Sequence, residues 1–268
     1  MNDAGIDAAA WAATAARAAD TALFFDFDGT LAPIQDDPAA VRPAPGVVAA
    51  VAELSRRVGR VAIVSARPVD FLRDRFGSLA AVDLYGLYGL EAHTAGRTHT
   101  DPVALRWAPT MAELADRARA ELPGPEIVEF KRLSLALHYR AAPEWESRVL
   151  AWARRHADRL GLRLQSGRMV VELKPPGDRD KGTVLREAVT DRRGGWYFGD
   201  DLSDLKAFAA LRQRAAADPD FQAVCVAVRN PETGHELAAA ADLTLDSPTA
   251  LAEFLAGGLR VLAGAPGH

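Results

Sequence analysis

The chain has 268 residues, 49% of them hydrophobic, and a formal charge of −4 at pH 7. It can therefore bury a full core in one large domain or two small ones. The mildly acidic charge gives no reason to expect nucleic acid or an anionic membrane as a partner. No segment approaches the roughly twenty apolar residues that cross a bilayer. The alanine-rich N-terminus is interrupted by Arg17 and Asp20 and is a poor signal peptide, so we expect a cytoplasmic protein.

Short apolar runs alternate with amphipathic helical patterns along most of the chain, which is typical of an α/β layered fold. The single cysteine, Cys225, lies in one of these runs and is expected to be a buried thiol. Helices are predicted at residues 46–57 and 69–76. Strands are predicted at residues 23–25, 61–64, 196–198, 223–228 and 243–245.

The middle of the chain has a different pattern, with two strand pairs on either side of a helix predicted at 144–160. In the first pair, apolar side chains alternate strictly and share one face. The strands are predicted at 127–130, 133–139, 163–165 and 169–173, and the second pair is predicted to turn at Ser166-Gly167.

Two hairpins and a helix, set inside a chain of alternating strands and helices, predict an inserted domain. We place this α/β cap at residues 98–173. The flanking segments, residues 1–97 and 174–268, then form the core, which we expect to be a Rossmann-like doubly wound α/β domain.

Two carboxylates, Asp26 and Asp28, directly follow the first predicted strand in the segment Asp26-Phe27-Asp28-Gly29-Thr30. They repel one another, and a divalent cation would offset that repulsion, since hard oxygen ligands suit Mg²⁺. Asp26 could then attack phosphorus, while Asp28 could protonate the leaving oxygen and later activate water. The alternative, a surface Asx-turn, does not explain why the pair follows an apolar strand.

Two further residues could bind a phosphate group. Ser65 ends the strand predicted at 61–64, where its hydroxyl could donate to a phosphate oxygen and Arg67 could add charge. Lys181 begins a predicted helix, where a lysine opposes the macrodipole unless an anion lies nearby. Each residue also has an ordinary explanation, because serine ends many strands and most lysines are simply exposed.

An acidic cluster, Asp200, Asp201 and Asp204, follows the strand predicted at 196–198. Helix capping explains one polar residue of this segment, Ser203 or Asp204. It leaves Asp200 and Asp201 at the end of a buried strand, where a cation would again offset the repulsion. Because ligands gather at the carboxyl ends of strands in a doubly wound sheet, all four signals predict one site.

This ordered set of motifs resembles the haloacid-dehalogenase superfamily of phosphatases, and the residues from Asp26 to Ile34 resemble its trehalose-6-phosphate phosphatase family. The resemblance implies that Asp26 is the nucleophile and Asp28 the general acid and base. It also implies that Ser65 and Lys181 bind the phosphate. Mg²⁺ would be bound by Asp26, the Asp28 backbone carbonyl and Asp200. Asp201 and Asp204 would make outer-shell metal contacts or orient Lys181.

The predicted cap is also similar to the cap segments of this family, which places sugar-binding side chains on it. The candidates are polar because a disaccharide presents many hydroxyl groups. The alternative is that they form salt bridges on an open sheet face. These candidate residues are Glu129, Lys131, Arg140 and Glu172.

Three segments depart from the family pattern. Ala66 stands where the family usually has glycine, and Leu205-Lys206 stands where it usually has Glu-Asp. Leu87-Tyr88 replaces the usual Asn-His before Gly89. The carboxylates are intact, so these changes bear on the substrate rather than on the chemistry.

The resemblance implies a Mg²⁺-dependent phosphatase that hydrolyses trehalose 6-phosphate through an aspartyl-phosphate intermediate, in trehalose biosynthesis. The expected partner is a small sugar phosphate only, and we expect a monomer. The alternatives are a capped phosphatase for a glycosyl-phosphoglycerate or sucrose phosphate, a phosphosugar mutase, and a catalytically silent sugar-phosphate sensor.

Overall fold

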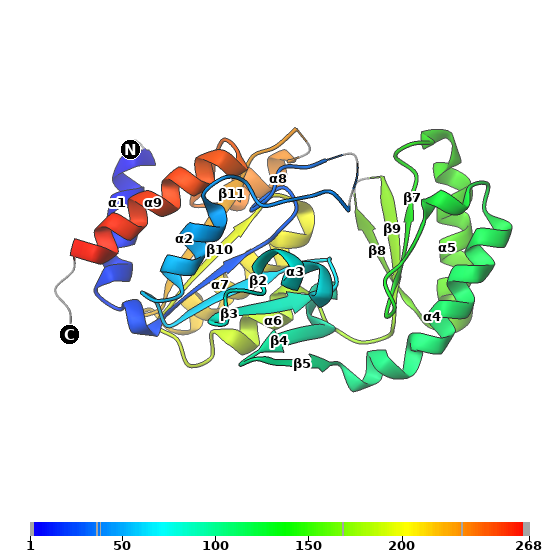
Figure 1. Ribbon diagram of the computed structural model, residues 1–268, viewed down its shortest axis with the longest axis horizontal. Helices are drawn as coiled ribbons and strands as arrows, with labels where there is room; N and C mark the ends of the chain where they lie inside the picture. Colours follow the sequence, from blue (N-terminus) through cyan, green and yellow to red (C-terminus); the bar gives the residue numbers. More distant parts are fainter. Residues whose placement is uncertain (1–2, 36, 38, 168, 232, 265–268) are drawn as a thin grey trace. The chain divides into compact units, whose positions relative to one another are not determined.

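The computed structural model describes residues 3–35, 37, 39–167, 169–231 and 233–264. The chain forms two compact units. The larger unit combines residues 1–98 with residues 179–268, and the smaller unit comprises residues 99–178. Figure 1 shows the helices and strands of each unit.

An eight-stranded sheet forms the centre of the larger unit, in the order β12-β11-β10-β1-β2-β3-β4-β5. The six strands from β12 to β3 are parallel, and β4 pairs with β3 in the antiparallel direction. This arrangement confirms the predicted α/β class with a doubly wound core. The strands are β1 (Thr21–Phe25), β2 (Arg60–Val64), β3 (Val82–Gly86), β4 (Glu91–Thr94), β5 (Arg97–Thr100), β10 (Gly194–Gly199), β11 (Gln222–Val228) and β12 (Leu243–Leu245).

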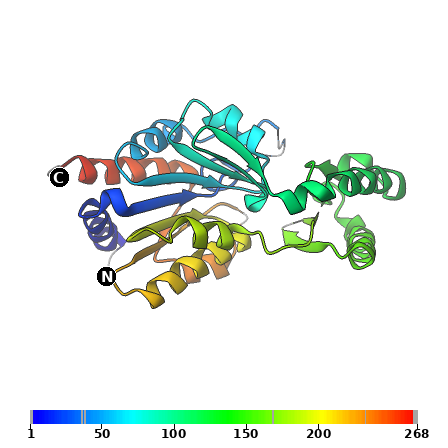
Figure 2. The same cartoon turned by 90° about the horizontal axis from the view of Figure 1, so that it is seen from below.

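Helices cover both faces of this sheet, which is why its central strands are continuous apolar runs rather than alternating ones. One face packs against α1, α2, α3 and α9, and the other packs against α6, α7 and α8 (Figure 2). The helices are α1 (Asp3–Ala15), α2 (Val47–Leu54), α3 (Val69–Phe76), α6 (Lys181–Ala188), α7 (Leu205–Ala217), α8 (His235–Ala240) and α9 (Pro248–Gly264). Short 3₁₀ helices are η1 (Ala18–Asp20), η2 (Leu87–Gly89) and η5 (Leu202–Asp204).

Aromatic stacking joins the strands that carry the catalytic candidates. Phe25 on β1 stacks on Phe198 on β10 with ring centroids 4.6 Å apart, and Trp196 stacks on Trp11 of α1 at 4.6 Å. The Trp196 indole N–H donates to the Thr14 hydroxyl at 2.9 Å. Cys225 is fully buried on β11, as predicted.

The smaller unit is a four-stranded antiparallel sheet in the order β6-β7-β9-β8, packed against α4 and α5 through a core of its own. Both predicted strand pairs are present, but the turn predicted at Ser166-Gly167 is wrong. Both residues lie in β8, and Gly167 pairs with Val170. The elements are α4 (Pro102–Glu121), η3 (Pro125–Ile127), β6 (Val128–Phe130), β7 (Leu135–His138), η4 (Pro143–Trp145), α5 (Glu146–Leu160), β8 (Arg163–Gly167) and β9 (Val170–Lys174).

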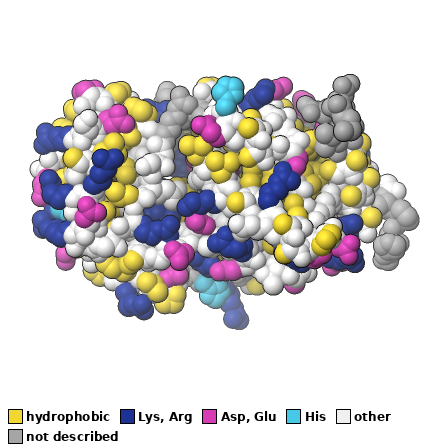
Figure 3. Space-filling model, turned by 180° about the vertical axis from the view of Figure 1, so that it is seen from behind, with side chains coloured by type: hydrophobic (Ala, Val, Ile, Leu, Met, Phe, Trp, Pro, Cys, Tyr) yellow, Lys and Arg dark blue, Asp and Glu magenta, His cyan; other side chains and the backbone are white. Residues whose placement is uncertain are grey.

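Surface charge agrees with the composition. On the face in Figure 3, acidic and basic side chains lie interspersed among apolar ones. Within the part of the chain that the structure describes, no helix has the length and apolar character needed to cross a bilayer.

Packing across the β1–β10 pair should contribute strongly to stability. Phe198→Ala deletes a fully buried ring and should lower the free energy of unfolding by about 3–5 kcal/mol. The matched control is Leu202→Ala, because Leu202 is 60% exposed and its loss should change stability by no more than about 0.5 kcal/mol. Denaturant unfolding followed by circular dichroism measures both, and equal effects would contradict this assignment of the core.

Candidate active site

The carboxyl ends of β2, β1 and β10 lie next to one another at one edge of the parallel sheet. Phe25 on β1 is in register with Ile63 on β2 and Phe198 on β10. Three predicted site residues therefore follow adjacent strand ends, which is where doubly wound folds place their ligands. They are Asp26, Ser65 and Asp200.

Lys181 links two of the candidate carboxylates. Its Nζ lies 3.0 Å from Asp26 Oδ1 and 2.7 Å from Asp204 Oδ1. The lysine is 2% exposed and is the first residue of α6, where Asp180 closes a capping box with Thr183. The anion expected near this helix terminus is thus present as carboxylates of the protein itself.

Asp204 is a hub of hydrogen bonds rather than an open ligand. Oδ1 accepts from Lys181 and from the Tyr197 hydroxyl at 2.6 Å, while Oδ2 accepts from the backbone N–H groups of Asp200 and Asp201 at 2.9 and 3.0 Å. A side chain at Gly199 would meet Asp204 Cγ at 2.4 Å, so glycine is required there. Asp204 therefore orients Lys181 and fixes the loop that carries Asp200.

Helix capping in this loop agrees with the prediction only in part. Asp201 is the N-cap of η5, and its carboxylate accepts from the backbone N–H of Ser203 at 2.8 Å. Capping was predicted for Ser203 or Asp204 at the next helix, α7, and the structure places Asp204 at that N-cap position but without a side-chain capping hydrogen bond. The buried Asp204 side chain instead completes the capping box of η5 by accepting from the Asp201 backbone N–H, while the exposed Asp201 caps that short helix.

Asp200 is held at both oxygens by neutral donors. Oδ1 accepts from the Thr30 hydroxyl at 3.2 Å, and Oδ2 accepts from the Asn230 side-chain amide at 2.7 Å. Gly29 has a φ of +81°, and a side chain there would meet Asp200 Oδ2 at 2.1 Å. Asn230 was missed in the sequence, although it follows the apolar strand 223–228 just as the predicted residues follow theirs.

The electrostatics of the cluster call for additional positive charge. One oxygen each of Asp26, Asp200 and Asp204 lies within 4.8 Å of the others, whereas Lys181 supplies one positive charge. Burial raises the pKa of Asp26 to about 8, with Lys181 opposing and Asp204 adding to the rise. Burial and Asp26 likewise raise the pKa of Asp200 well above its usual value.

Lys181 stays charged in this environment. Burial alone would lower the pKa of its ammonium group, but Asp204 and Asp26 together outweigh burial and raise that pKa. One buried lysine thus serves two carboxylates and leaves the third, Asp200, without an ionic partner among the residues just described.

This set of carboxylate oxygens fits a hard divalent cation, because such cations prefer oxygen ligands. Asp26 and Asp200 would hold the ion, together with the Asp28 backbone carbonyl that the family resemblance implies. Asp204 would remain outside the coordination sphere because four donors already occupy its oxygens.

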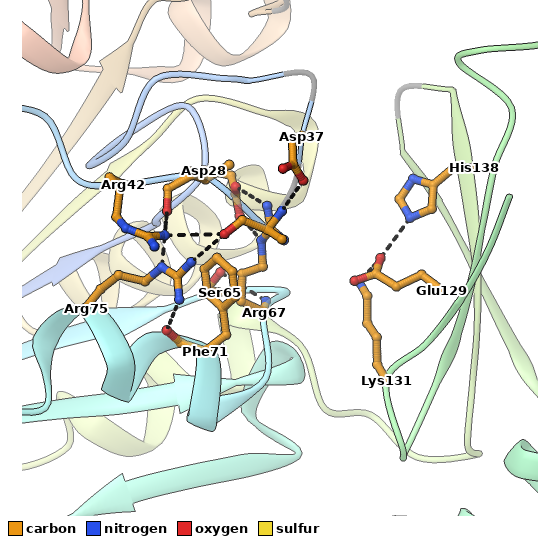
Figure 4. A network of polar contacts seen from close by, with 12 residues as sticks. Asp28, Asp37, Arg42, Ser65, Arg67, Phe71, Arg75, Glu129, Lys131 and His138 are labelled. Atoms are coloured by element: carbon orange, nitrogen blue, oxygen red, sulfur yellow. Dashed lines mark hydrogen bonds and ion pairs between the residues drawn. The ribbon is translucent and has the colours of Figure 1, made fainter. Parts of the chain in front are cut away.

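The Asp28 side chain forms a bidentate ion pair with Arg67. Arg67 Nε donates to Asp28 Oδ2 at 2.8 Å, and Nη2 donates to Oδ1 at 2.7 Å (Figure 4). Arg67 was predicted to add positive charge at a phosphate, and the structure instead pairs it with the acid/base candidate. Ser65 is buried, and its hydroxyl accepts from the Arg67 backbone N–H at 3.1 Å.

In the smaller unit, three of the four predicted sugar-binding residues lie together. Lys131 Nζ is 3.7 Å from Glu129 Oε2 and 3.6 Å from Glu172 Oε2. Glu129 and Glu172 both pair with Ala136 across the sheet, so they share one face. Arg140 is exposed just beyond the end of β7.

Two neighbours of this group were missed in the sequence. The His138 ring lies 2.8 Å from Glu129 Oε2, and the buried Ser134 hydroxyl donates to Glu172 Oε1 at 2.6 Å. The ion pairs predicted by the alternative interpretation are therefore present. Sugar binding by these residues stays a prediction.

The fold is that of haloacid-dehalogenase-like hydrolases. A hydrolase of that description from Bacteroides thetaiotaomicron superposes with a TM-score of 0.61 at 15% identity, covering 88% of this chain and 98% of that one. The C-terminal domain of C. albicans trehalose-6-phosphate phosphatase superposes with a TM-score of 0.77 at 20% identity, covering 97% of each chain.

The chain belongs to the trehalose-phosphatase family, whose model matches residues 24–247. This membership confirms the resemblance found in the sequence. Trehalose-phosphate phosphatases are similar over 87% of the chain, with 39% identity in Mycolicibacterium paratuberculosis and 36% in Mycobacterium leprae. The chain spans 60% and 56% of the length of these two relatives.

Cation binding should depend on pH in a defined direction. Because the pKa of Asp26 is raised from 3.8 to about 8, this group destabilises the metal-free fold progressively as pH rises between those values. A divalent cation should therefore raise Tm more at pH 8 than at pH 5. At about 100 times Kd the gain is about 2.7 kcal/mol, or roughly 5–10 °C.

Thermal unfolding with MgCl₂ against EDTA, at constant ionic strength, measures this effect. The control is Asp200→Asn, which should abolish the cation-dependent rise in Tm. An equal rise at both pH values, or a rise that survives in Asp200→Asn, would contradict the assigned site.

Proposed function

We propose that this chain hydrolyses trehalose 6-phosphate to trehalose and phosphate in trehalose biosynthesis. The observation that carries the proposal is the buried cluster in which Lys181 lies 3.0 Å from Asp26 and 2.7 Å from Asp204, in a chain of the trehalose-phosphatase family. The names of its relatives support the choice of substrate.

Asp26 is the proposed nucleophile of this reaction. One of its carboxylate oxygens forms a bond to phosphorus, the bond from phosphorus to the sugar oxygen breaks, and a proton from Asp28 passes to that oxygen. Water then attacks phosphorus and gives a proton to Asp28, and the bond from phosphorus to Asp26 breaks. Asp28 thus acts first as acid and then as base.

Lys181 and Ser65 are the proposed ligands of the phosphoryl oxygens. Lys181 is held in place by Asp204 and stays positively charged, so it can stabilise negative charge that develops on the transferring group. Mg²⁺, held by Asp26 and Asp200, would supply further charge neutralisation at the phosphoryl oxygens. Hydrolysis of phosphate monoesters is among the slowest uncatalysed reactions, so the site must lower the barrier by a large amount.

We propose the smaller unit as the cap that confers substrate specificity. Its polar sheet face carries Glu129, Lys131 and Glu172, and these side chains offer both donors and acceptors to sugar hydroxyl groups. Arg140, at the end of β7, is a further candidate. Ion pairs among them hold the carboxylates in place before a sugar arrives, which reduces the entropy lost on binding.

A panel of phosphate esters tests the reaction and the substrate together. Trehalose 6-phosphate with Mg²⁺ should release phosphate in an EDTA-sensitive manner, faster than glucose 6-phosphate, sucrose 6-phosphate or a glycosyl-phosphoglycerate. Release from another ester alone would keep the mechanism and exclude this substrate, whereas a mutase would release little phosphate from any. No reaction with any ester would favour the silent sensor.

Asp26→Asn should abolish turnover because the amide cannot form the covalent intermediate. The variant should remain folded, since it removes a buried carboxylate whose pKa is raised. Phosphate release and Tm measure the two effects. The control is Asp70→Asn on α3, an exposed aspartate that should leave turnover unchanged, and appreciable turnover in Asp26→Asn would exclude it as nucleophile.

Lys131→Met should weaken sugar recognition selectively. A hydrogen bond to a charged group contributes about 1.5–3 kcal/mol, so kcat/KM for trehalose 6-phosphate should fall roughly 10- to 100-fold, mainly through KM. Turnover of p-nitrophenyl phosphate, which lacks the disaccharide, should stay unchanged. The control is Arg119→Met on the exposed side of α4, and an equal loss with both substrates would argue against sugar binding by Lys131.

A further inference from the structure

The ion pair between Asp28 and Arg67 occupies both oxygens of the proposed acid/base carboxylate. Arg67 Nε and Nη2 lie 2.8 and 2.7 Å from Oδ2 and Oδ1. The side chains are 29% exposed for Asp28 and 13% exposed for Arg67. Such a fork-to-fork arrangement fixes direction as well as distance, because the planar guanidinium matches the carboxylate geometry.

Arg67 is itself held in place from several sides. Its backbone N–H donates to the Ser65 hydroxyl, and its carbonyl accepts from the Leu87 N–H at 2.9 Å. Its guanidinium lies over the Phe71 ring at 4.4 Å, and that of Arg75 lies over the same ring at 3.4 Å. Cation–π contacts of this kind anchor a guanidinium without consuming its N–H donors.

Arg75 in turn ties this group to the loop after β1. Its Nε donates to the Val41 carbonyl at 3.1 Å, and its Nη2 donates to the Ala39 carbonyl at 2.9 Å. The neighbouring Arg42 donates to the same two carbonyl groups at 3.1 and 3.3 Å (Figure 4). The direction of Asp28 is therefore set by a chain of contacts that reaches across two loops of the larger unit.

This arrangement conflicts with catalysis unless the pair opens. A general acid must present an oxygen and its proton to the leaving group, and both Asp28 oxygens accept from Arg67. We propose that Arg67 is a positioning residue for Asp28. During each proton transfer Arg67 releases one Asp28 oxygen and keeps its hydrogen bond to the other. The inference rests on the proposed phosphatase reaction but not on the identity of the sugar.

A merely structural ion pair makes a different prediction. Its loss would lower stability only slightly, as for other partly exposed pairs, and would alter turnover of every substrate alike. A positioning role predicts effects only on the steps in which Asp28 moves a proton. The choice of leaving group separates the two steps of the reaction, formation and decay of the aspartyl-phosphate. A leaving group that needs no proton makes only the decay step depend on Asp28.

Arg67→Met, which keeps an unbranched side chain but removes the guanidinium that pairs with Asp28 and lies over Phe71, tests the proposal with p-nitrophenyl phosphate and trehalose 6-phosphate. Nitrophenolate leaves without a proton, so the first turnover should keep its wild-type rate. Decay of the aspartyl-phosphate, which needs Asp28 as base, should slow at least about 10-fold. The variant should therefore show a burst of one nitrophenolate per site, and turnover of trehalose 6-phosphate should fall without a burst.

Arg67→Lys keeps the charge but can bond only one oxygen at a time, so its decay rate should lie between those of wild type and Arg67→Met. The matched control is Arg73→Met, which removes an exposed arginine of α3 that pairs with Asp70 at 3.7 Å. It should leave both steps unchanged. Arg67→Lys also keeps the test open if Arg67→Met does not fold.

A double-mutant cycle shows whether Arg67 acts through Asp28. In an Asp28→Asn background, Arg67→Met should change the decay of the aspartyl-phosphate by no more than about two-fold. A further large loss of the decay rate in that background would overturn the proposal. An unchanged decay rate in Arg67→Met, or an equal loss in both steps with p-nitrophenyl phosphate, would overturn it as well. If the wild-type protein turns over p-nitrophenyl phosphate but not trehalose 6-phosphate, the substrate proposal fails. The role of Arg67 can then still be tested with p-nitrophenyl phosphate.

Discussion

Repulsion among buried carboxylates is the constraint on which the rest of the larger unit depends. Three aspartates meet at adjacent strand ends, with one lysine between two of them. Such a cluster is tolerated only where positive charge and hydrogen-bond donors are supplied from every side. The surrounding residues supply both. Lys181, at the start of α6, gives the positive charge, and Tyr197 on β10 donates to Asp204. Thr30 and Asn230 donate to Asp200.

The fold was predictable because each local pattern agrees with the tertiary structure. Mainly apolar runs of three to six residues, with polar residues at or just after their ends, predicted strands that are buried on both faces and carry ligands at their ends. The helix predicted at 69–76 is α3 with the same bounds, whereas the helix predicted at 46–57 ends earlier, at Leu54. The order of the motifs along the chain then indicated Asp26, Lys181 and Asp200, which the structure brings together.

The remaining features depend on side-chain direction, which spacing along the chain does not determine. Asp204 turns inward and Asp201 caps η5, although both stand in one acidic segment. Arg67 pairs with Asp28, 39 residues away, and Asn230 reaches Asp200 from the loop after β11. A polar residue after a strand was visible in each case, but its partner is fixed only when the sheet is assembled.

The turn η2 has a consequence for how this family can vary. Leu87 and Tyr88 adopt positive φ values of 50° and 59°, a conformation that asparagine tolerates better than leucine or tyrosine. Their backbone N–H groups nevertheless bind the carbonyl groups of Arg67 and Ser65. These two main-chain hydrogen bonds hold η2 against the loop that carries Ser65. Because both bonds use backbone N–H groups, substitutions at positions 87 and 88 that keep the backbone conformation would leave them in place.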